Sequence, residues 1–298
     1  VSSTNTITYT EGSDELSHFR LESSEFNTDG ALTSGGLTVQ LREEPADSGE
    51  YLGFTVDPST GAETTIFTLN FNASVKGQYT FTLLEALDHA DASGNNTLSF
   101  DLPVYAVDSD GDDSAMKPLQ VTIEDDVQVM QDGSWTIVGP TLGTSDVETT
   151  ATIDVMPEQS ADGATITQFT FGSETRALDL EATGEQAFSF DEGTLYITLE
   201  GDMRFEPNSD LDHSNGDIVK TIVVTSNDAD NDKQTATVTL TITDGANPII
   251  DTVPNVTLSE TLLDDGSVGG TAPVSSTNTI TYTEGSDELS HFRLESSE

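Results

Sequence analysis

The sequence is poor in several residue types that would point to a specific chemistry. It contains no cysteine, one tryptophan and only nine basic residues among 298. Disulfide bonds, cysteine-ligated zinc and thiol catalysis are therefore excluded. No stretch approaches the 18 consecutive apolar residues of a membrane-spanning helix. Stability has to come from ordinary hydrophobic cores, for which a hydrophobic content of 34% is sufficient.

The charge is strongly one-sided. The 54 acidic residues give a formal net charge of −45. A nucleic acid or an anionic membrane surface is excluded as a partner, because binding either one needs a basic surface. So many carboxylates repel one another unless cations screen or bind them. A salt-adapted surface and a divalent-cation protein are both compatible with this composition.

The hydrophobic pattern is that of β-strands almost throughout. Short alternating runs rich in Thr, Val, Ile and Phe are separated by Gly, Asn, Asp and Ser clusters. Clear examples are residues 65–71, 97–108, 219–228 and 235–244. Turn signals about every 8–12 residues predict an all-β protein of antiparallel, Ig-like, Greek-key sandwiches joined head to tail.

The chain also repeats itself. Residues 274–298 duplicate residues 1–25 letter for letter, a period of 273 residues (274 − 1). Within that period, 86–126 and 210–245 share one order of features: Leu-Asp-His, a long strand, an acidic loop, a last strand and an acidic end.

We therefore predict three parts. Residues 1–126 form a sandwich that lacks its first strand, 127–246 form a complete sandwich, and 247–298 begin the next repeat. A strand over 255–261 would be the missing first strand. The 247–298 segment is expected to complete a sandwich of a neighbouring molecule or of its own chain.

The two acidic loops carry the most specific local signal. "DSDGDD" begins at Asp108 and "DADND" at Asp228, and both place carboxylates on alternate residues around a sharp turn, a pattern suited to a hard cation. An EF-hand is rejected because its twelfth position would be Leu119 and no helices flank the loop. The competing interpretation is a solvated hairpin turn, since Asp, Asn and Gly favour turns.

Strand direction predicts how the acidic groups combine. A long strand separates each loop from the acidic end of its own domain by roughly 30 Å, so an ion would be shared across a junction between consecutive domains. The 124–126 end would face the 228–232 loop, and the 244–251 end would face the 108–112 loop of a following domain, here supplied by another molecule. Oxygen-only ligands favour Ca²⁺ over Mg²⁺. The predicted metal ligands are Asp108, Asp110, Asp112, Glu124, Asp125, Asp126, Asp228, Asp230, Asp232, Asp244, Asn247 and Asp251.

Other chemistries find little support. His89 and His213 follow Asp at equivalent places, and each loop offers a single histidine where zinc needs three or four converging ligands. A structural hydrogen-bonding role is expected for both. No Ser/His/Asp constellation is present, no carboxylate pair stands out as a glycosidase couple, and Trp135 alone makes an aromatic sugar platform unfavourable. The chain is not expected to be an enzyme.

The string "TFTLLEALDHADASGNNTLSFDLPVYAVDSDGDDS…VTIEDD", which ends at Asp126, resembles the repeat of giant type I-secreted RTX adhesins of Gram-negative bacteria, in a class common in Vibrio-like species. The second half is similar in a more degenerate form. This resemblance implies an extracellular, cell-surface extender: head-to-tail repeats, rigidified by Ca²⁺, that project a distal binding region in cell adhesion and biofilm formation. The alternatives are a carbohydrate-, protein- or ice-binding adhesion domain, or a hydrolase that uses the carboxylates.

Overall fold

The computed structural model describes residues 1–90, 96–140, 149–161, 163–209, 211–263, 265–268 and 274–295. It is an all-β structure, with two short 3-10 turns, η1 (Ser23–Glu25) and η2 (Glu260–Leu262). No helix in these ranges is long and apolar enough to cross a membrane.

Two compact units share the chain. The first consists of 1–131, 156–168 and 225–236, and the second of 132–155, 169–224 and 237–298. Each unit is therefore assembled from segments that lie far apart in the sequence.

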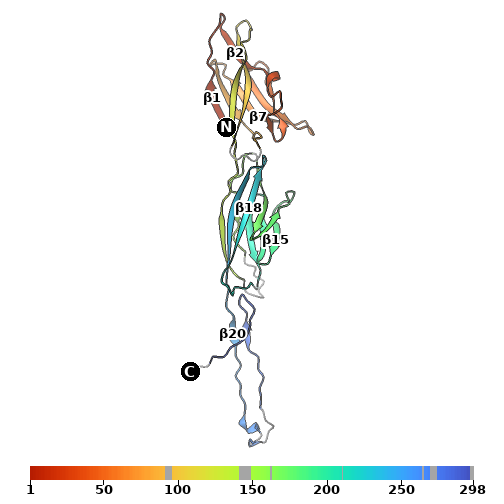
Figure 1. The fold of residues 1–298 in the computed structure, drawn as a ribbon, viewed down its shortest axis with the longest axis vertical. Coiled ribbons are helices and arrows are strands. Elements are labelled where there is room, and N and C mark those ends of the chain that lie inside the picture. The colour runs from red at the N-terminus through yellow and green to blue at the C-terminus, as the bar shows by residue number, and fades with distance from the viewer. Residues whose placement is uncertain are drawn as a thin grey trace. The chain divides into compact units, whose positions relative to one another are not determined.

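The N-terminal half forms two facing antiparallel sheets (Figure 1). The five-stranded sheet has the order β1 (Ser2–Thr6), β8 (Gln78–Leu83), β7 (Glu63–Phe71), β6 (Glu50–Val56) and β5 (Gln40–Glu43). The three-stranded sheet has the order β10 (Lys117–Glu124), β9 (Thr97–Asp108) and β2 (Leu16–Leu21). Between β2 and β5 in the chain, β3 (Thr33–Ser34) and β4 (Leu37–Thr38) form a small antiparallel pair.

Aromatic rings fill the space between these sheets. Phe67 of β7 is fully buried, with its ring 5.1 Å from that of Phe81 and 5.7 Å from that of Phe100. Gly53 of β6 stands opposite Phe67 in the strand register, and a β-carbon there would overlap the ring. The alternation predicted for 65–71 thus serves to place large side chains in one core.

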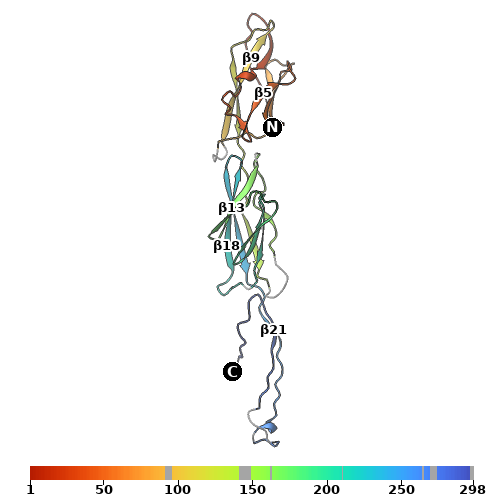
Figure 2. The same ribbon diagram turned by 90° about the vertical axis from the view of Figure 1, so that its right-hand side faces the viewer.

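The following segment also forms two sheets, whose strands include β13 and β18 in Figure 2. One has the order β11 (Gly133–Val138), β19 (Lys233–Thr243), β18 (Ile218–Asp228), β13 (Ala164–Phe171) and β14 (Glu174–Ala177). The other has the order β12 (Ile153–Asp154), β17 (Asp202–Pro207), β16 (Gly193–Ile197) and β15 (Gln186–Phe190).

The pairing of β11 with β19 is parallel, with Trp135 opposite Leu240 and Ile137 opposite Ile242. Alternation predicts that a segment is a strand but not its direction, because both directions bury the same face. Trp135 donates its indole N–H to the carbonyl oxygen of Ala151 at 2.9 Å, which satisfies its polar atom inside the core.

The C-terminal segment pairs with itself. β20 (Ile249–Thr252) and β21 (Thr281–Thr283) form a two-stranded antiparallel sheet. Residues 253–259 have no regular structure, so the strand expected over 255–261 does not form in this chain. A strand is stable only when its backbone N–H and C=O groups pair with a neighbouring strand. The pairing of residues 255–261 with another molecule stays a prediction.

Candidate metal sites

The loop between β9 and β10 is closed by two of its aspartates, Asp108 and Asp112. The backbone N–H of Asp108 donates to the carbonyl oxygen of Asp112 at 3.1 Å, and the N–H of Asp112 donates to Asp108 Oδ1 at 2.8 Å. Gly111 has a φ of +96°, in the left-handed region that glycine adopts without strain. The turn is thereby fixed around Asp110.

The loop between β18 and β19 repeats this geometry. The N–H of Asp228 donates to the carbonyl oxygen of Asp232 at 3.2 Å, and the N–H of Asp232 donates to Asp228 Oδ1 at 2.7 Å. Asn231, with a φ of +69°, takes the place of Gly111. The two loops, offset by 120 residues, are therefore one structural element in two copies, and Asp230 is the counterpart of Asp110.

The two copies differ in burial. Asp230 is 5% exposed and Asp232 is 2% exposed, whereas Asp110 is exposed. Asp125 is the first residue after β10. One carboxylate oxygen from each of Asp125, Asp230 and Asp232 lies within 4.8 Å of the others. All three residues belong to the first compact unit.

Three contacts hold the buried cluster together. Gln128, 2% exposed, donates its side-chain Nε2 to Ser226 Oγ at 2.8 Å and to the carbonyl oxygen of Asp232 at 3.0 Å. The N–H of Ala161 donates to Asp126 Oδ2 at 3.1 Å. The chain after β10 is thus tied to the 228–232 loop and to the 156–168 segment of the same unit.

The electrostatics of this cluster are unfavourable without a cation. Both carboxylate oxygens of Asp230 and Oδ2 of Asp232 are buried without a hydrogen-bond partner among the described residues. Burial raises the pKa of Asp125, and the charges of Asp230 and Asp232 raise it further while His89 opposes them. Two like charges 4.8 Å apart repel by about 3 kcal/mol at an effective dielectric constant of about 20.

The donor set of the cluster fits a hard divalent cation. Every group that the three residues offer is a carboxylate oxygen, and Ca²⁺ takes about 6–8 oxygen ligands from carboxylates, backbone carbonyls and water. Asp125, Asp230 and Asp232 would hold the ion, which would supply the positive charge that the cluster lacks. No nitrogen or sulfur ligand is among them.

A second cluster lies at the 108–112 loop. Oxygens of Asp14, Asp108 and Asp110 lie within 4.8 Å of one another, and Asp14 and Asp110 are exposed. The pKa of Asp110 is raised, because its carboxyl group hydrogen-bonds to Asp108 and faces that residue's charge. Exposed acidic groups of this kind are satisfied by water, so the geometry alone does not identify a cation site.

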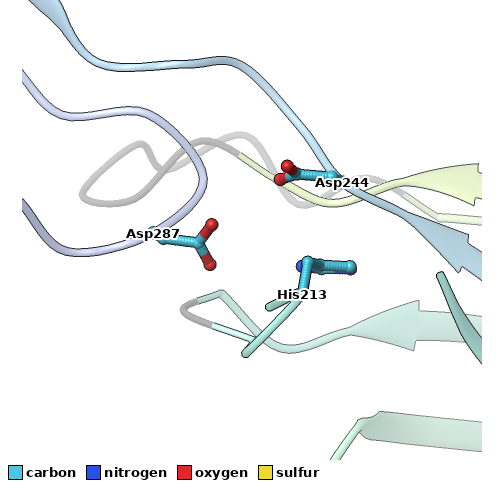
Figure 3. Close-up of side chains that lie close together, drawn as sticks. All are labelled: His213, Asp244 and Asp287. Atoms are coloured by element: carbon cyan, nitrogen blue, oxygen red, sulfur yellow. The ribbon is translucent and has the colours of Figure 1, made fainter. Parts of the chain in front are cut away.

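A third cluster combines a histidine with two carboxylates. His213, which precedes β18, lies with Asp244 after β19 and Asp287 after β21 (Figure 3). The three side chains come from different segments, all within the second compact unit. One ligand atom of each lies within 4.8 Å of the other two.

Comparison with known proteins gives likenesses of fold at low similarity. No protein-family model matches the chain, and no curated protein matches it. Among solved structures, Drosophila N-cadherin EC1-3 aligns with a TM-score of 0.26 and 13% identity, over 78% of this chain and 57% of that chain. Zebrafish RET cadherin-like domains 1 to 4 align with a TM-score of 0.28 and 11% identity, over 82% and 46%.

Chicken VE-cadherin EC1-2 aligns with a TM-score of 0.24 and 14% identity, over 82% of this chain and 92% of that chain. The chain spans about half the length of the Drosophila and zebrafish structures. At TM-scores this low, the likenesses carry no argument about function or partners.

The remaining predicted ligands have other environments. Glu124 is exposed at the end of β10, and Asn247 is exposed before β20. Asp251 accepts a hydrogen bond from Thr283 Oγ1 at 3.1 Å across the β20–β21 pair. Asp112 and Asp228 close their loops through the hydrogen bonds described above. Among the described residues, Glu124, Asp251, Asp112 and Asp228 join no cluster of three acidic or histidine side chains.

Sequence reasoning missed Asp14, Asp287 and the surroundings of His213. Asp14 and Asp287 are the same position of the duplicated 25-residue string, and each lies in a cluster. The duplication was the signal that could have pointed to these residues. The same aspartate occurs in both copies of the string, so it can lie near acidic groups at two places in the chain. Asp244 is among the predicted metal ligands, but its approach to His213 and that of Asp287 could not be foreseen. The two carboxylates come from segments 31 and 74 residues away from the histidine (244 − 213 and 287 − 213).

Proposed function

We propose that this chain is a calcium-stabilised structural spacer, built from tandem β-sandwich repeats of an extracellular bacterial adhesin of the RTX kind. The observation that carries this proposal is the buried cluster of Asp125, Asp230 and Asp232, whose donors are carboxylate oxygens. The role is mechanical and not catalytic: a bound ion converts repulsion between neighbouring segments into a shared coordination shell.

The energetics support a resident cation. A buried carboxylate without a counter-charge costs several kcal/mol, and protonation or a bound cation is the means to offset it. Raised Ca²⁺ stabilises the folded state by about 2.7 kcal/mol when its free concentration is 100 times the dissociation constant. Millimolar extracellular Ca²⁺ suits even weak sites of this type.

The duplicated string supports a tandem arrangement. Asp14 clusters with Asp108 and Asp110, and its duplicate Asp287 clusters with His213 and Asp244. In a head-to-tail series of repeats, Asp14 of one repeat would be the Asp287 of the repeat before it. That single aspartate would lie in both clusters at once. We propose neighbouring repeats of the same protein as the partners of this chain, with the 247–298 segment completing the sandwich of a neighbour.

The test is the Asp230→Asn variant, with Asp110→Asn as its matched control. The two residues hold equivalent places in the two loops, and only Asp230 is buried. In EDTA, Asp230→Asn is expected to melt at the wild-type temperature or above it, because a buried like charge is removed. In millimolar Ca²⁺ it is expected to melt several degrees below wild type, because a ligand is lost.

Asp110→Asn is expected to follow the wild type closely in both conditions. Scanning calorimetry with and without Ca²⁺ makes the measurement. Equal melting temperatures of the wild type in Ca²⁺ and EDTA would contradict the proposal, as would equal Ca²⁺-dependent losses in the two variants.

A further inference from the structure

We infer that His213, Asp244 and Asp287 form a second cation site of different chemistry, which takes a first-row transition metal such as Zn²⁺ rather than Ca²⁺. This site is separate from the Asp125, Asp230 and Asp232 cluster and does not depend on its occupancy.

The imidazole of His213 is prepared for metal binding. Its Nδ1 lies 2.9 Å from the carbonyl oxygen of Leu211, and a carbonyl oxygen can only accept, so Nδ1 carries the proton. The neutral ring then presents the lone pair of Nε2. That atom is buried without a hydrogen-bond partner among the described residues, in a side chain only 8% exposed. A histidine ligand fixed by a backbone carbonyl through its other nitrogen is the usual arrangement at metal sites.

The ring is held in place by its surroundings. His213 is 8% exposed, and its Nδ1 donates to the carbonyl oxygen of Leu211. The orientation of the imidazole is therefore set before any ion arrives, which lowers the entropic cost of binding.

The loop that carries Asp287 is fastened to the segment that carries Asp244. The N–H of Ser286 donates to the carbonyl oxygen of Ala246 at 2.8 Å, and Ser286 Oγ donates to Asp244 Oδ1 at 2.9 Å. Gly245 donates its N–H to Ser286 Oγ at 3.2 Å, and a β-carbon at Gly245 would meet Ser286 Cβ at 2.7 Å. The hydroxyl engages one oxygen of Asp244 and leaves the other for an ion.

The donor set discriminates between metals. Imidazole nitrogen suits Zn²⁺ and its first-row neighbours, whereas Ca²⁺ takes oxygen ligands. One histidine and two carboxylates give three protein ligands with an open position for water. Ligand atoms around a tetrahedral Zn²⁺ are about 3.3 Å apart, so atoms that now lie within 4.8 Å must move closer. The exposed Asp244 and the half-exposed Asp287 side chains have room for this movement.

The test measures Zn²⁺ and Co²⁺ binding to the untagged chain in saturating Ca²⁺, which occupies carboxylate-only sites. Titration calorimetry is expected to show one Zn²⁺ site that weakens at least tenfold in His213→Gln. His89→Gln replaces the histidine at the equivalent place, and His291→Gln replaces an exposed histidine close to Asp287 in sequence. Both controls are expected to bind Zn²⁺ as the wild type does.

Asp287→Asn provides a second variant in a more exposed loop. It is also expected to lower the Zn²⁺ affinity at least tenfold. Co²⁺ is expected to give visible absorption bands of low-symmetry coordination that both site variants lose. Unchanged Zn²⁺ affinity in either site variant would overturn the inference, as would the loss of Zn²⁺ binding to the wild type in saturating Ca²⁺. The Ca²⁺-dependent melting shift involves Asp230 and not His213, so this failure is distinguishable from failure of the proposed function.

Discussion

At the scale of single residues, Gly53 shows how tightly the first core is packed. It pairs with Phe67 across β6 and β7, and the ring occupies the space that a side chain would need. Gly53→Ala is therefore expected to destabilise the fold by about 1–3 kcal/mol through overpacking. Gly12→Ala is the control, because nothing lies within 4 Å of its added β-carbon. Urea unfolding in EDTA measures both, and equal losses would contradict the packing argument.

Asp57 gives a prediction for pH dependence at an exposed turn. The N–H and hydroxyl of Ser59 both donate to Asp57 Oδ1, at 2.7 and 2.6 Å, and the N–H of Thr60 adds a third bond. These bonds, led by the Ser59 hydroxyl, lower the pKa of Asp57 to about 2. Since the folded pKa lies below the unfolded value, this turn stabilises the fold above the unfolded pKa, and the contribution is lost as pH falls toward 2.

The measurement is an NMR titration of the Asp57 carboxyl carbon, with a midpoint expected near 2. Ser59→Ala removes the largest cause and is expected to raise that midpoint toward the ordinary value. An Asp57 midpoint that does not move in Ser59→Ala would show that the hydroxyl bond is not the cause.

At the scale of elements, the two acidic loops differ at one backbone position. Asn231 adopts a φ of +69° where the equivalent residue is Gly111. Asn tolerates this conformation, Gly prefers it, and a β-branched residue is strained there. Asn231→Val is thus expected to cost about 1–2 kcal/mol, while Asn231→Gly is expected to leave stability nearly unchanged. Thermal unfolding in EDTA separates this backbone effect from any ion, and equal costs for Val and Gly would refute it.

The duplicated string shows what local sequence cannot decide. Residues 2–6 form β1 and pair with β8, whereas the identical residues 275–279 form no strand. Conversely, 281–283 form β21 against β20, whereas the identical residues 8–10 form none. The same side chains are present in both copies, so the difference lies in the neighbouring strand edge. Strand formation is decided by the partner ladder as much as by propensity.

The same reasoning explains which features could be predicted. The run at 97–108 became β9 with those bounds, because strong alternation and flanking turn residues are local signals. The equivalence of the two acidic loops was also predictable, because each loop has the same spacing of aspartates in its own sequence. The parallel direction of β11 and the approach of Asp287 to His213 depend on tertiary packing. No local pattern encodes either one.

At the scale of the whole molecule, the net charge of −45 has two components that respond differently to salt. Most carboxylates lie on the surface, where ions screen them with a Debye length of about 10 Å at 0.1 M and about 3 Å at 1 M. Asp230 and Asp232 are buried, and buried charges are screened much less. Sodium chloride therefore weakens the repulsion between surface carboxylates. It has little effect on the repulsion between the buried carboxylates of the Asp125, Asp230 and Asp232 cluster.

This separation predicts two salt responses in one protein. We expect the melting temperature to rise gradually with sodium chloride and to rise steeply with millimolar Ca²⁺, well beyond the effect of sodium chloride at matched ionic strength. In Asp230→Asn the gradual response should persist while the steep one shrinks, because the variant changes the buried cluster and scarcely alters the total charge. Calorimetry of both proteins across the two titrations makes the comparison. Coincident curves for Ca²⁺ and sodium chloride at equal ionic strength would mean that Ca²⁺ only screens the surface, and the buried cluster would then have no role as an ion site.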